Sequence, residues 1–169
     1  MKKTTKNIVR GKKLVQREEN HVFLKLAVLF VIVVIAIIGL WVNFFGSHDL
    51  NIQTPNGVVS FKVERALTPA QQQKGLMFRE SLGEKEGMIF LFAKNRIAQM
   101  WMKNTFIPLD MIFFDDNGHV VLIHRNAQPL DLKLISSVVP VAGVLEINAG
   151  ASKKFGINTR SKLDLKMVR

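Results

Sequence analysis

Residues 50–64, LNIQTPNGVVSFKVE, decide how the larger part of this chain folds. Apolar residues alternate with polar ones over residues 50–54 and again over residues 59–63. A period of two is typical of a strand with one buried face. Between the two runs, Pro-Asn-Gly at residues 55–57 supplies a tight turn. The stretch therefore predicts a β-hairpin.

The rest of the chain repeats this strand pattern. A second hairpin is expected around the Asp-Asp-Asn-Gly turn at residues 115–118. Thr68-Pro69-Ala70-Gln71 has the form of a capping box and predicts a helix of about two turns that Gly75 ends. Residues 152–156 predict one further helical turn. The other expected strands are residues 88–92, 97–102, 109–114, 120–124, 144–147 and 163–167, with 97–102 pairing beside 88–92. The pattern predicts a mostly β fold, a small β-sandwich or partly closed barrel with one or two short helices.

An uncharged apolar run of twenty residues, Leu26 to Phe45, precedes this domain. As a helix it would be about 30 Å long, which matches the hydrocarbon core of a bilayer. Residues 1–45 carry eight Lys and Arg against two Glu, and such a basic flank stays on the cytoplasmic side. We expect one N-terminal transmembrane helix in the cytoplasmic (inner) membrane, with a periplasmic or extracellular C-terminal domain. A cleaved signal peptide is the alternative, but its apolar region is usually about 7–15 residues.

Four segments follow from this organisation: a basic cytoplasmic tail (1–21), a transmembrane anchor (22–45), a short stalk (46–49) and an exported β-rich domain (50–169). Residues 46–169 carry sixteen basic residues against eleven acidic ones, a net charge of +5 out of +11 for the chain. This mild charge predicts no nucleic-acid partner. The membrane is the expected partner, together with a membrane-protein or envelope component. The sequence leaves the oligomeric state open.

The densest chemical stretch is MWMKNTFIPLD at residues 100–110. If a strand continues to residue 102, Trp101 and Lys103 share one face, and a planar or anionic ligand could stack at that rim. The alternative is a structural role, in which Trp101 packs at the core edge while Asn104 and Thr105 bond their own loop. In that alternative, Asp110 pairs with Lys103 or Arg79. Both interpretations stay open at this point.

Several blocks, in order, resemble the domain-of-unknown-function 192 family over roughly residues 52–166. They are Lys74 to Leu82, Glu86 to Phe90, Trp101 to Thr105, Ile107 to Asp110, Leu145-Glu146 and Ala149-Gly150. The resemblance implies a compact, mostly β domain, often secreted or membrane-tethered, and no established reaction. The sequence departs from the family pattern at two places. Met100 stands where the family usually has an aromatic residue, and Arg160-Ser161 stands where the family usually has Gly-Asp. A glycine at the first of these two positions would permit a turn conformation that Arg160 resists.

Some of the residues that carry the resemblance have a sufficient structural explanation, Gly75, Gly87 and Gly150 as turn or cap residues and Leu76 as core. The remaining candidates form the predicted ligand-binding set: Arg79, Trp101, Lys103, Asn104, Thr105, Asp110 and Glu146. We interpret the protein as a membrane-tethered extracytoplasmic binding or accessory module that recognises a small ligand, an envelope component or a membrane partner.

Two other functions are weighed against this one. A hydrolase-like enzyme could use Asp110 or Glu146 as a general base, with Lys103 and Asn104 holding an oxyanion. No catalytic motif supports that choice, so catalytic residues are left unknown. Copper binding is the lesser alternative, because five methionines lie close in sequence and thioethers hold Cu(I). Methionine more often fills core space, and the chain has no cysteine, so we expect no metal or cofactor. The five methionines are Met77, Met88, Met100, Met102 and Met111.

Overall fold

The computed structural model of the chain describes residues 25–36 and 46–168. The chain divides into two compact units, Met1–Gly46 and Ser47–Arg169. In the first unit, residues 25–36 are helical with mostly exposed side chains. None of the helices within the described ranges has the length and apolar character needed to cross a membrane. The predicted tail (1–21) and residues 22–24 and 37–45 of the predicted anchor lie outside the described residues.

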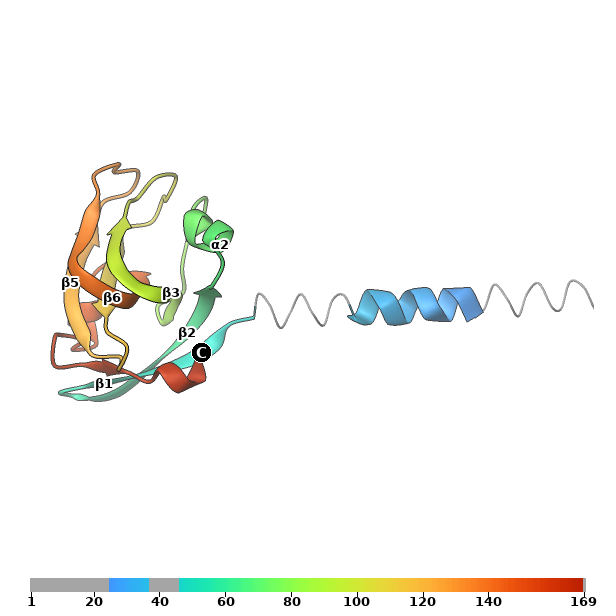
Figure 1. Cartoon of the computed structure of the whole chain (residues 1–169), viewed down its shortest axis with the longest axis horizontal. Coiled ribbons are helices and arrows are strands. Elements are labelled where there is room, and N and C mark those ends of the chain that lie inside the picture. Colours follow the sequence, from blue (N-terminus) through green and yellow to red (C-terminus); the bar gives the residue numbers. More distant parts are fainter. Residues whose placement is uncertain (1–24, 37–45, 169) are drawn as a thin grey trace, which may run out of the picture. The chain divides into compact units, whose positions relative to one another are not determined.

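The second unit is built around one seven-stranded sheet with the strand order β5-β4-β6-β3-β2-β1-β7 (Figure 1). Only the β2–β3 pair is parallel, and the other pairs are antiparallel. The elements are β1 (His48–Thr54), β2 (Gly57–Ala66), α2 (Pro69–Lys74), β3 (Glu86–Met100), β4 (Leu109–Phe114), β5 (Val120–Ala127), β6 (Ile135–Asn148), α3 (Ala151–Lys154), β7 (Lys162–Leu163) and the 3₁₀ helix η1 (Leu165–Met167).

Both predicted hairpins are confirmed. β1 and β2 pair from His48 opposite Val63 to Thr54 opposite Gly57, and β4 and β5 pair across the turn at residues 115–118. β1 begins inside the segment 46–49 that the sequence assigns to a stalk. The predicted helix is also confirmed as α2, with the full capping box between Thr68 and Gln71.

The sequence prediction for residues 88–102 is wrong in one respect. Residues 88–92 and 97–100 belong to one long strand, β3, and both parts pair with β6. The polar residues between them form an irregularity in the strand, where the pairing register shifts between Leu91 and Arg96. An irregularity of this kind keeps the chain extended while bending it, so a polar interruption need not end a strand.

The C-terminal strand is also shorter than predicted. β7 covers only Lys162–Leu163, and Asp164 then caps η1 by accepting from the backbone N–H of Lys166. The preceding turn closes without glycine because side chains hold it. Asn158 accepts from the N–H of Arg160 at 2.9 Å, and Ser161 accepts from the N–H of Asn158 at 3.0 Å. Arg160 is not among the residues with positive φ.

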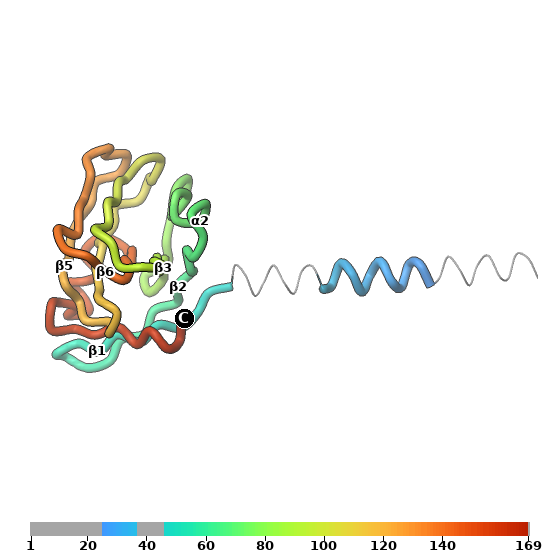
Figure 2. Tube along the Cα trace, in the orientation of Figure 1, coloured from blue at the N-terminus to red at the C-terminus, as the bar shows by residue number. Residues whose placement is uncertain are grey.

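The sheet curls, so that its two edges approach each other (Figures 1 and 2). The N–H of Val120 donates to Ser161 at 3.1 Å, and the N–H of Leu163 donates to Gly118 at 2.8 Å. These bonds bring the start of β5 next to β7, although the sheet is open elsewhere. Of the two predicted architectures, the partly closed barrel is therefore correct, and a sandwich of two separate sheets is wrong.

Two apolar clusters fill the two sides of the sheet. One cluster lies inside the curl and includes Leu50, Phe61 and Leu145. The other lies on the outer face, where the segments after α2 and after β3 cover the sheet, and it includes Leu76 and Met102. Covering segments of this kind allow the central strands to be buried on both faces. The candidate site lies in the outer cluster.

Candidate ligand-binding cleft

Glu146 is a buried carboxyl group in the middle of the sheet. It lies on β6, opposite Met88 of β3 and opposite Met111 of β4. Its side chain is only 4% exposed, and it makes no hydrogen bond or ion pair with any residue that the structure describes. Burial raises the pKa of Glu146 to about 8, because removing the carboxylate from water penalises the charged form.

A small recess opens onto Glu146. It has a volume of about 50 Å³ and lies between the end of α2, strand β3 and the segment after β3. An ordered water occupies about 30 Å³ in the liquid, so the recess holds one small group. Its lining includes Gln72, Lys74, Gly75, Leu76, Met77, Phe90, Gln99, Met100, Trp101, Thr105 and Glu146.

A wider groove adjoins this recess. It has a volume of about 450 Å³ and is lined by Pro69, Gln72, Gln73, Phe90, Phe92, Arg96, Gln99, Met100 and Trp101. The recess and the groove share Phe90, Gln99, Met100 and Trp101 among their lining residues, so they are parts of one concave region. The groove falls in the size range of small-molecule sites, roughly 300–1,000 Å³. Hereafter, the two parts are called the recess and the groove, and together they form the cleft.

Trp101 stands at the boundary between recess and groove and is 40% exposed. The ammonium of Lys103 lies 5.2 Å from the centroid of its ring, which is within the range of a cation–π contact. The two residues therefore lie on the same side, as the sequence predicts, although β3 ends at Met100. A large aromatic face beside a groove is suited to stacking or apolar contact with a ligand.

Helix α2 forms one wall of the cleft and is fixed to the sheet by Gln72. The side-chain amide of Gln72 donates to the carbonyl of Leu91 at 2.9 Å and to that of Ala66 at 3.2 Å. Gln72 therefore joins the helix to both neighbouring strands instead of standing in solvent. Gly75 ends the helix with φ 49°, and a Cβ there would lie 3.2 Å from the ring of Phe90. Glycine permits both this backbone conformation and this close approach.

The segment after β3 forms the other wall. The hydroxyl of Thr105, which is 5% exposed, donates to the carbonyl of Lys103 at 3.3 Å. Asn104 has φ 55°, a left-handed conformation that asparagine tolerates better than most residues. Its carbonyl accepts from the N–H of Phe78 at 2.8 Å, and this bond joins the segment to the one after α2. The predicted bonding of Thr105 within its own loop is confirmed.

Asp110 does not line the cleft. It is fully buried, and its carboxylate accepts from the backbone N–H of Asn126 at 2.9 Å and from the N–H and hydroxyl of Ser152 at 3.0 and 2.6 Å. Pairing of Asp110 with Lys103 or Arg79 is therefore wrong. Asp110 precedes Met111, which lies opposite Glu146, and successive strand residues point to opposite faces. The two carboxyl groups thus belong to opposite faces of the sheet.

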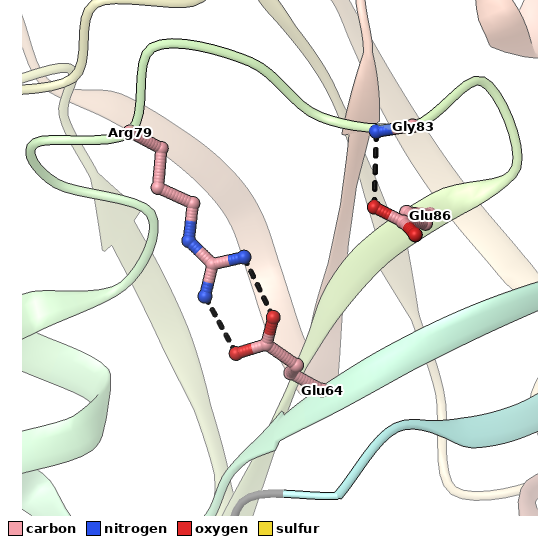
Figure 3. Close-up of polar contacts among 4 residues, drawn as sticks. All are labelled: Glu64, Arg79, Gly83 and Glu86. Carbon is pink, nitrogen blue, oxygen red and sulfur yellow. Dashed lines mark hydrogen bonds and ion pairs between the residues drawn. The ribbon is translucent and has the colours of Figure 1, made fainter.

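The side chain of Arg79 makes its hydrogen bonds outside the cleft. Its guanidinium forms two 2.6 Å hydrogen bonds to the carboxylate of Glu64 on β2 (Figure 3). In the same view, the N–H of Gly83 donates to the carboxylate of Glu86 at 3.0 Å. The first contact holds the segment after α2 against β2, and the second closes the turn that leads into β3. Arg79 is thus engaged in a bidentate ion pair within the domain.

The structure gathers three of the seven predicted site residues, Trp101, Thr105 and Glu146, around one recess. Lys103 lies beside Trp101, and the side-chain amide of Asn104 donates to the sulfur of Met77, which lines the recess. Arg79 and Asp110 bond elsewhere. The sequence reasoning missed Gln72, Gln99 and Arg96 as lining residues, because glutamine and arginine in short polar stretches resemble ordinary surface. Glycine is needed at position 87 for a different reason from the predicted turn. It lies within β3, where a Cβ would come 2.5 Å from the carbonyl oxygen of Glu146.

The methionines gather near the same carboxyl group. Met77 and Met100 line the recess, and Met88 and Met111 flank Glu146 in the sheet. Met88, Met102 and Met111 are buried in the outer apolar cluster, where flexible side chains fill irregular space. Within residues 25–36 and 46–168, no three His, Asp or Glu side chains are grouped as a metal site would require.

Comparison with known proteins places the domain in a family. Residues 51–165 match the domain-of-unknown-function 192 family, described as "Uncharacterized ACR", and the chain belongs to that family. No curated protein matches the chain. The match covers nearly the whole second unit, so the family defines the curled sheet and its cleft rather than the N-terminal segment.

Two solved structures are similar to this chain. A candidate transcription regulator from Sinorhizobium meliloti 1021 is 39% identical over 71% of this chain and 94% of that chain, with a TM-score of 0.69. A protein of unknown function from Novosphingobium aromaticivorans DSM 12444 is 41% identical over 69% of this chain and 83% of that chain, with a TM-score of 0.67. Since the first match spans almost all of the other chain, a domain of this kind forms a compact structure without a segment like residues 1–46.

Proposed function

We propose that the protein is a membrane-tethered binding module whose cleft receives a small ligand, with Glu146 as the polar group that recognises it. The observation that carries this proposal is the unpaired state of Glu146, which is 4% exposed and faces the recess. Buried polar groups in folded proteins nearly always have a partner, either in the protein or in ordered water. A carboxyl group without one, at the base of an open cleft, is suited to a partner that comes from outside the chain.

The composition of the cleft supports the same conclusion. Small-molecule sites are concave, mostly apolar and equipped with a few convergent polar groups. Here the apolar part comes from Phe90, Phe92 and Trp101, and the polar part from Glu146 and Thr105. A buried residue with a displaced pKa in a cleft is also a common property of functional sites.

The tethering part of the proposal rests on the sequence. The uncharged run over residues 26–45 and the basic flank before it support a single-pass anchor with the N-terminus in the cytoplasm. The domain would then act at the outer surface of the cytoplasmic membrane, where a ligand or a membrane-bound partner is delivered locally.

A hydrolytic function is less well supported by the geometry. A pair of carboxyl groups sharing one cleft would suit acid–base chemistry, but Asp110 lies on the other face of the sheet and is engaged with Ser152 and Asn126. Glu146 alone can bind and orient a ligand. Binding is therefore the function that this arrangement supports best.

Native mass spectrometry of residues 47–169, produced behind a cleavable export signal so that the domain reaches the proposed compartment, tests the proposal. The parent domain should carry an additional mass that Glu146→Gln and Trp101→Ala both lose while remaining folded. Glu80→Gln, which changes an exposed glutamate outside the cleft, is the matched control and should keep the mass. A ligand retained by Glu146→Gln would contradict the proposal, as would a bare parent domain that also fails to bind any compound of a small-molecule screen.

A further inference from the structure

We infer that the ligand is a zwitterion, which places a primary ammonium group in the recess against Glu146 and an anionic group in the groove near Arg96. This inference rests on the proposed function and names the chemical class of the ligand. It combines three observations: the size of the recess, the unpaired carboxyl group within it, and an arginine in the groove with no acidic partner among the described residues.

The recess admits only a small head group. Its volume of about 50 Å³ is little more than the ~30 Å³ that one water molecule takes up in the liquid, so it suits an ammonium better than a trimethylammonium or a ring. The body of the ligand must then lie in the groove of about 450 Å³, where Phe92 and Trp101 offer apolar surface. The shape of the cleft thus separates a small head from a larger body.

The chemistry of the recess favours an ammonium. A carboxyl group that is buried and unpaired gains most from a cationic donor, since charge-assisted hydrogen bonds are roughly twice as strong as neutral ones. The hydroxyl of Thr105 gives its own proton to the Lys103 carbonyl, so its oxygen can accept a second donor. The ring of Trp101 adds an attractive surface for a cation.

The charges around the cleft favour a second, anionic group on the ligand. Lys74 of α2 lines the recess and Arg96 of β3 lines the groove. The strand residues directly beside Glu146, Met88 of β3 and Met111 of β4, do not titrate. Neither cation forms an ion pair within the described part of the chain. Both residues would repel a purely cationic ligand, whereas in a zwitterion the attraction of Arg96 for the anionic group offsets the repulsion that Lys74 exerts on the ammonium.

Arg96 is positioned to bind such a group. Its guanidinium stacks 4.0 Å from the ring centroid of Phe92 and reaches the amide oxygen of Gln72 at 3.5 Å. This stacking leaves guanidinium N–H donors free for a carboxylate or phosphate, which arginine binds in a bidentate manner. Both Phe92 and Gln72 line the groove, so the guanidinium is held within it.

Binding of this ligand would release a proton from the protein. In the free domain Glu146 has a pKa of about 8, so at pH 7 about nine-tenths of the molecules carry the proton on its carboxyl group. An ammonium in the recess favours the carboxylate, and the carboxyl proton passes to the buffer while the ammonium keeps its own protons. A neutral hydroxyl in the same position would leave the carboxyl group protonated.

Isothermal titration calorimetry on residues 47–169 tests this inference with a series of ω-amino acids, 4-aminobutanoate, 6-aminohexanoate and 8-aminooctanoate, which differ in spacer length. The controls are 6-hydroxyhexanoate and hexylammonium, each lacking one charged group, and N,N,N-trimethyl-6-aminohexanoate, whose head exceeds the recess. Titration at pH 7 in two buffers of different ionisation enthalpy, neither of them phosphate nor a primary amine, gives the number of protons released from the difference in apparent enthalpy.

The expected result is that at least one amino acid binds tenfold or more tightly than every control and releases close to one proton. Glu146→Gln should abolish both binding and proton release, and Arg96→Gln should reduce the affinity to that of hexylammonium. Equal binding of the hydroxy acid or the trimethylated analogue would overturn the inference. The inference would also be overturned if native mass spectrometry identified the additional mass on the parent domain as a copper ion.

The two proposals fail in different ways. If the native domain carries a ligand that Glu146→Gln loses, yet no amino acid of the series binds, the zwitterion inference is wrong and the proposed function stands. If neither the native domain nor the titrations show a ligand in the cleft, both are wrong.

Discussion

Asp110 and Ser152 form a buried contact in which one carboxylate oxygen accepts two hydrogen bonds, from the Ser152 N–H at 3.0 Å and from the Ser152 hydroxyl at 2.6 Å. Both residues are fully buried. The second oxygen accepts from the N–H of Asn126 at 2.9 Å. These hydrogen bonds tie the start of α3 and the end of β5 to β4. They explain why Asp110, which lies outside the cleft, is among the residues that match the family pattern.

Asp110→Asn should therefore destabilise the domain without weakening ligand binding. An asparagine amide would turn a donor towards the Ser152 N–H, leaving a buried group unsatisfied, and we expect a loss of about 2–4 kcal/mol in the free energy of unfolding. Ser152→Ala should cost less, about 1–2 kcal/mol, because the carboxylate keeps two donors, although the Nε of Arg125 also loses the hydroxyl that it donates to at 3.1 Å. Urea unfolding measures both changes.

Titration of a ligand that binds the parent provides the control for these two variants. Under conditions where they are folded, each should bind with the affinity of the parent. A folded Asp110→Asn variant that has lost binding would show that Asp110 serves the ligand rather than the fold.

The ion pair between Arg79 and Glu64 should also matter for stability alone. Its two bonds are 2.6 Å long, but both side chains are about one-third exposed, and exposed pairs contribute little. We expect Arg79→Lys to cost about 1 kcal/mol or less, since lysine cannot form the bidentate contact. High salt should reduce the difference between parent and variant. A variant that folds normally and loses ligand would instead support a direct role for Arg79.

Glu146 should make the stability of the domain depend on pH. Its pKa is raised from 4.5 in the unfolded chain to about 8 in the folded one, so the folded state binds more protons between these values. The free energy of unfolding should therefore fall as pH rises from about 4.5 to 8, by up to roughly 1.4 kcal/mol per unit, and level off above that.

Glu146→Gln removes this term, because glutamine does not titrate. The melting temperature of the variant relative to the parent should be higher at pH 9 than at pH 5, and differential scanning calorimetry at the two values measures the difference. Glu80→Gln serves as the control and should show a smaller change between the two pH values. If the melting temperatures of Glu146→Gln and the parent differed by the same amount at both pH values, Glu146 would be ionised in the folded protein at both.

Trp101 should matter for binding more than for stability. It is 40% exposed at the edge of the cleft, so Trp101→Ala should cost only about 1 kcal/mol in unfolding free energy, while the ligand loses its aromatic contact. Trp101→Phe should restore part of the affinity because it keeps an aromatic face. Fluorescence or calorimetric titration measures both variants. If alanine and phenylalanine bind equally well, the ligand does not contact this residue.

The curled sheet is well predicted by the sequence because its signals are local. Alternation and turn residues locate the β1–β2 and β4–β5 hairpins, and the capping box at Thr68 locates α2. The course of β3 is not local. Its continuation through Lys94-Asn95-Arg96 depends on pairing with β6, which lies some forty residues later in the chain, and no pattern within the strand shows that partner.

The cleft is predicted only in part for the same reason. Trp101, Thr105 and Glu146 are found from the family resemblance, but their convergence depends on how β6 is placed beside β3. The family pattern also contains residues that hold the fold, such as Asp110, and sequence cannot separate these from ligand-binding residues. Gln72 and Arg96 become visible only when the walls of the cleft are assembled.

Titration of the Glu146 carboxyl carbon by NMR, in the free domain and with a bound amino acid of the ω series, shows whether this carboxyl group is protonated when free and ionised by the ligand. We expect a free-domain pKa near 8 and an ionised Glu146 at pH 7 once the ligand is bound, with the resonance identified by its loss in Glu146→Gln. A free-domain pKa near the ordinary value, unchanged by every compound of the series, would contradict the claim that Glu146 is held unpaired for a ligand.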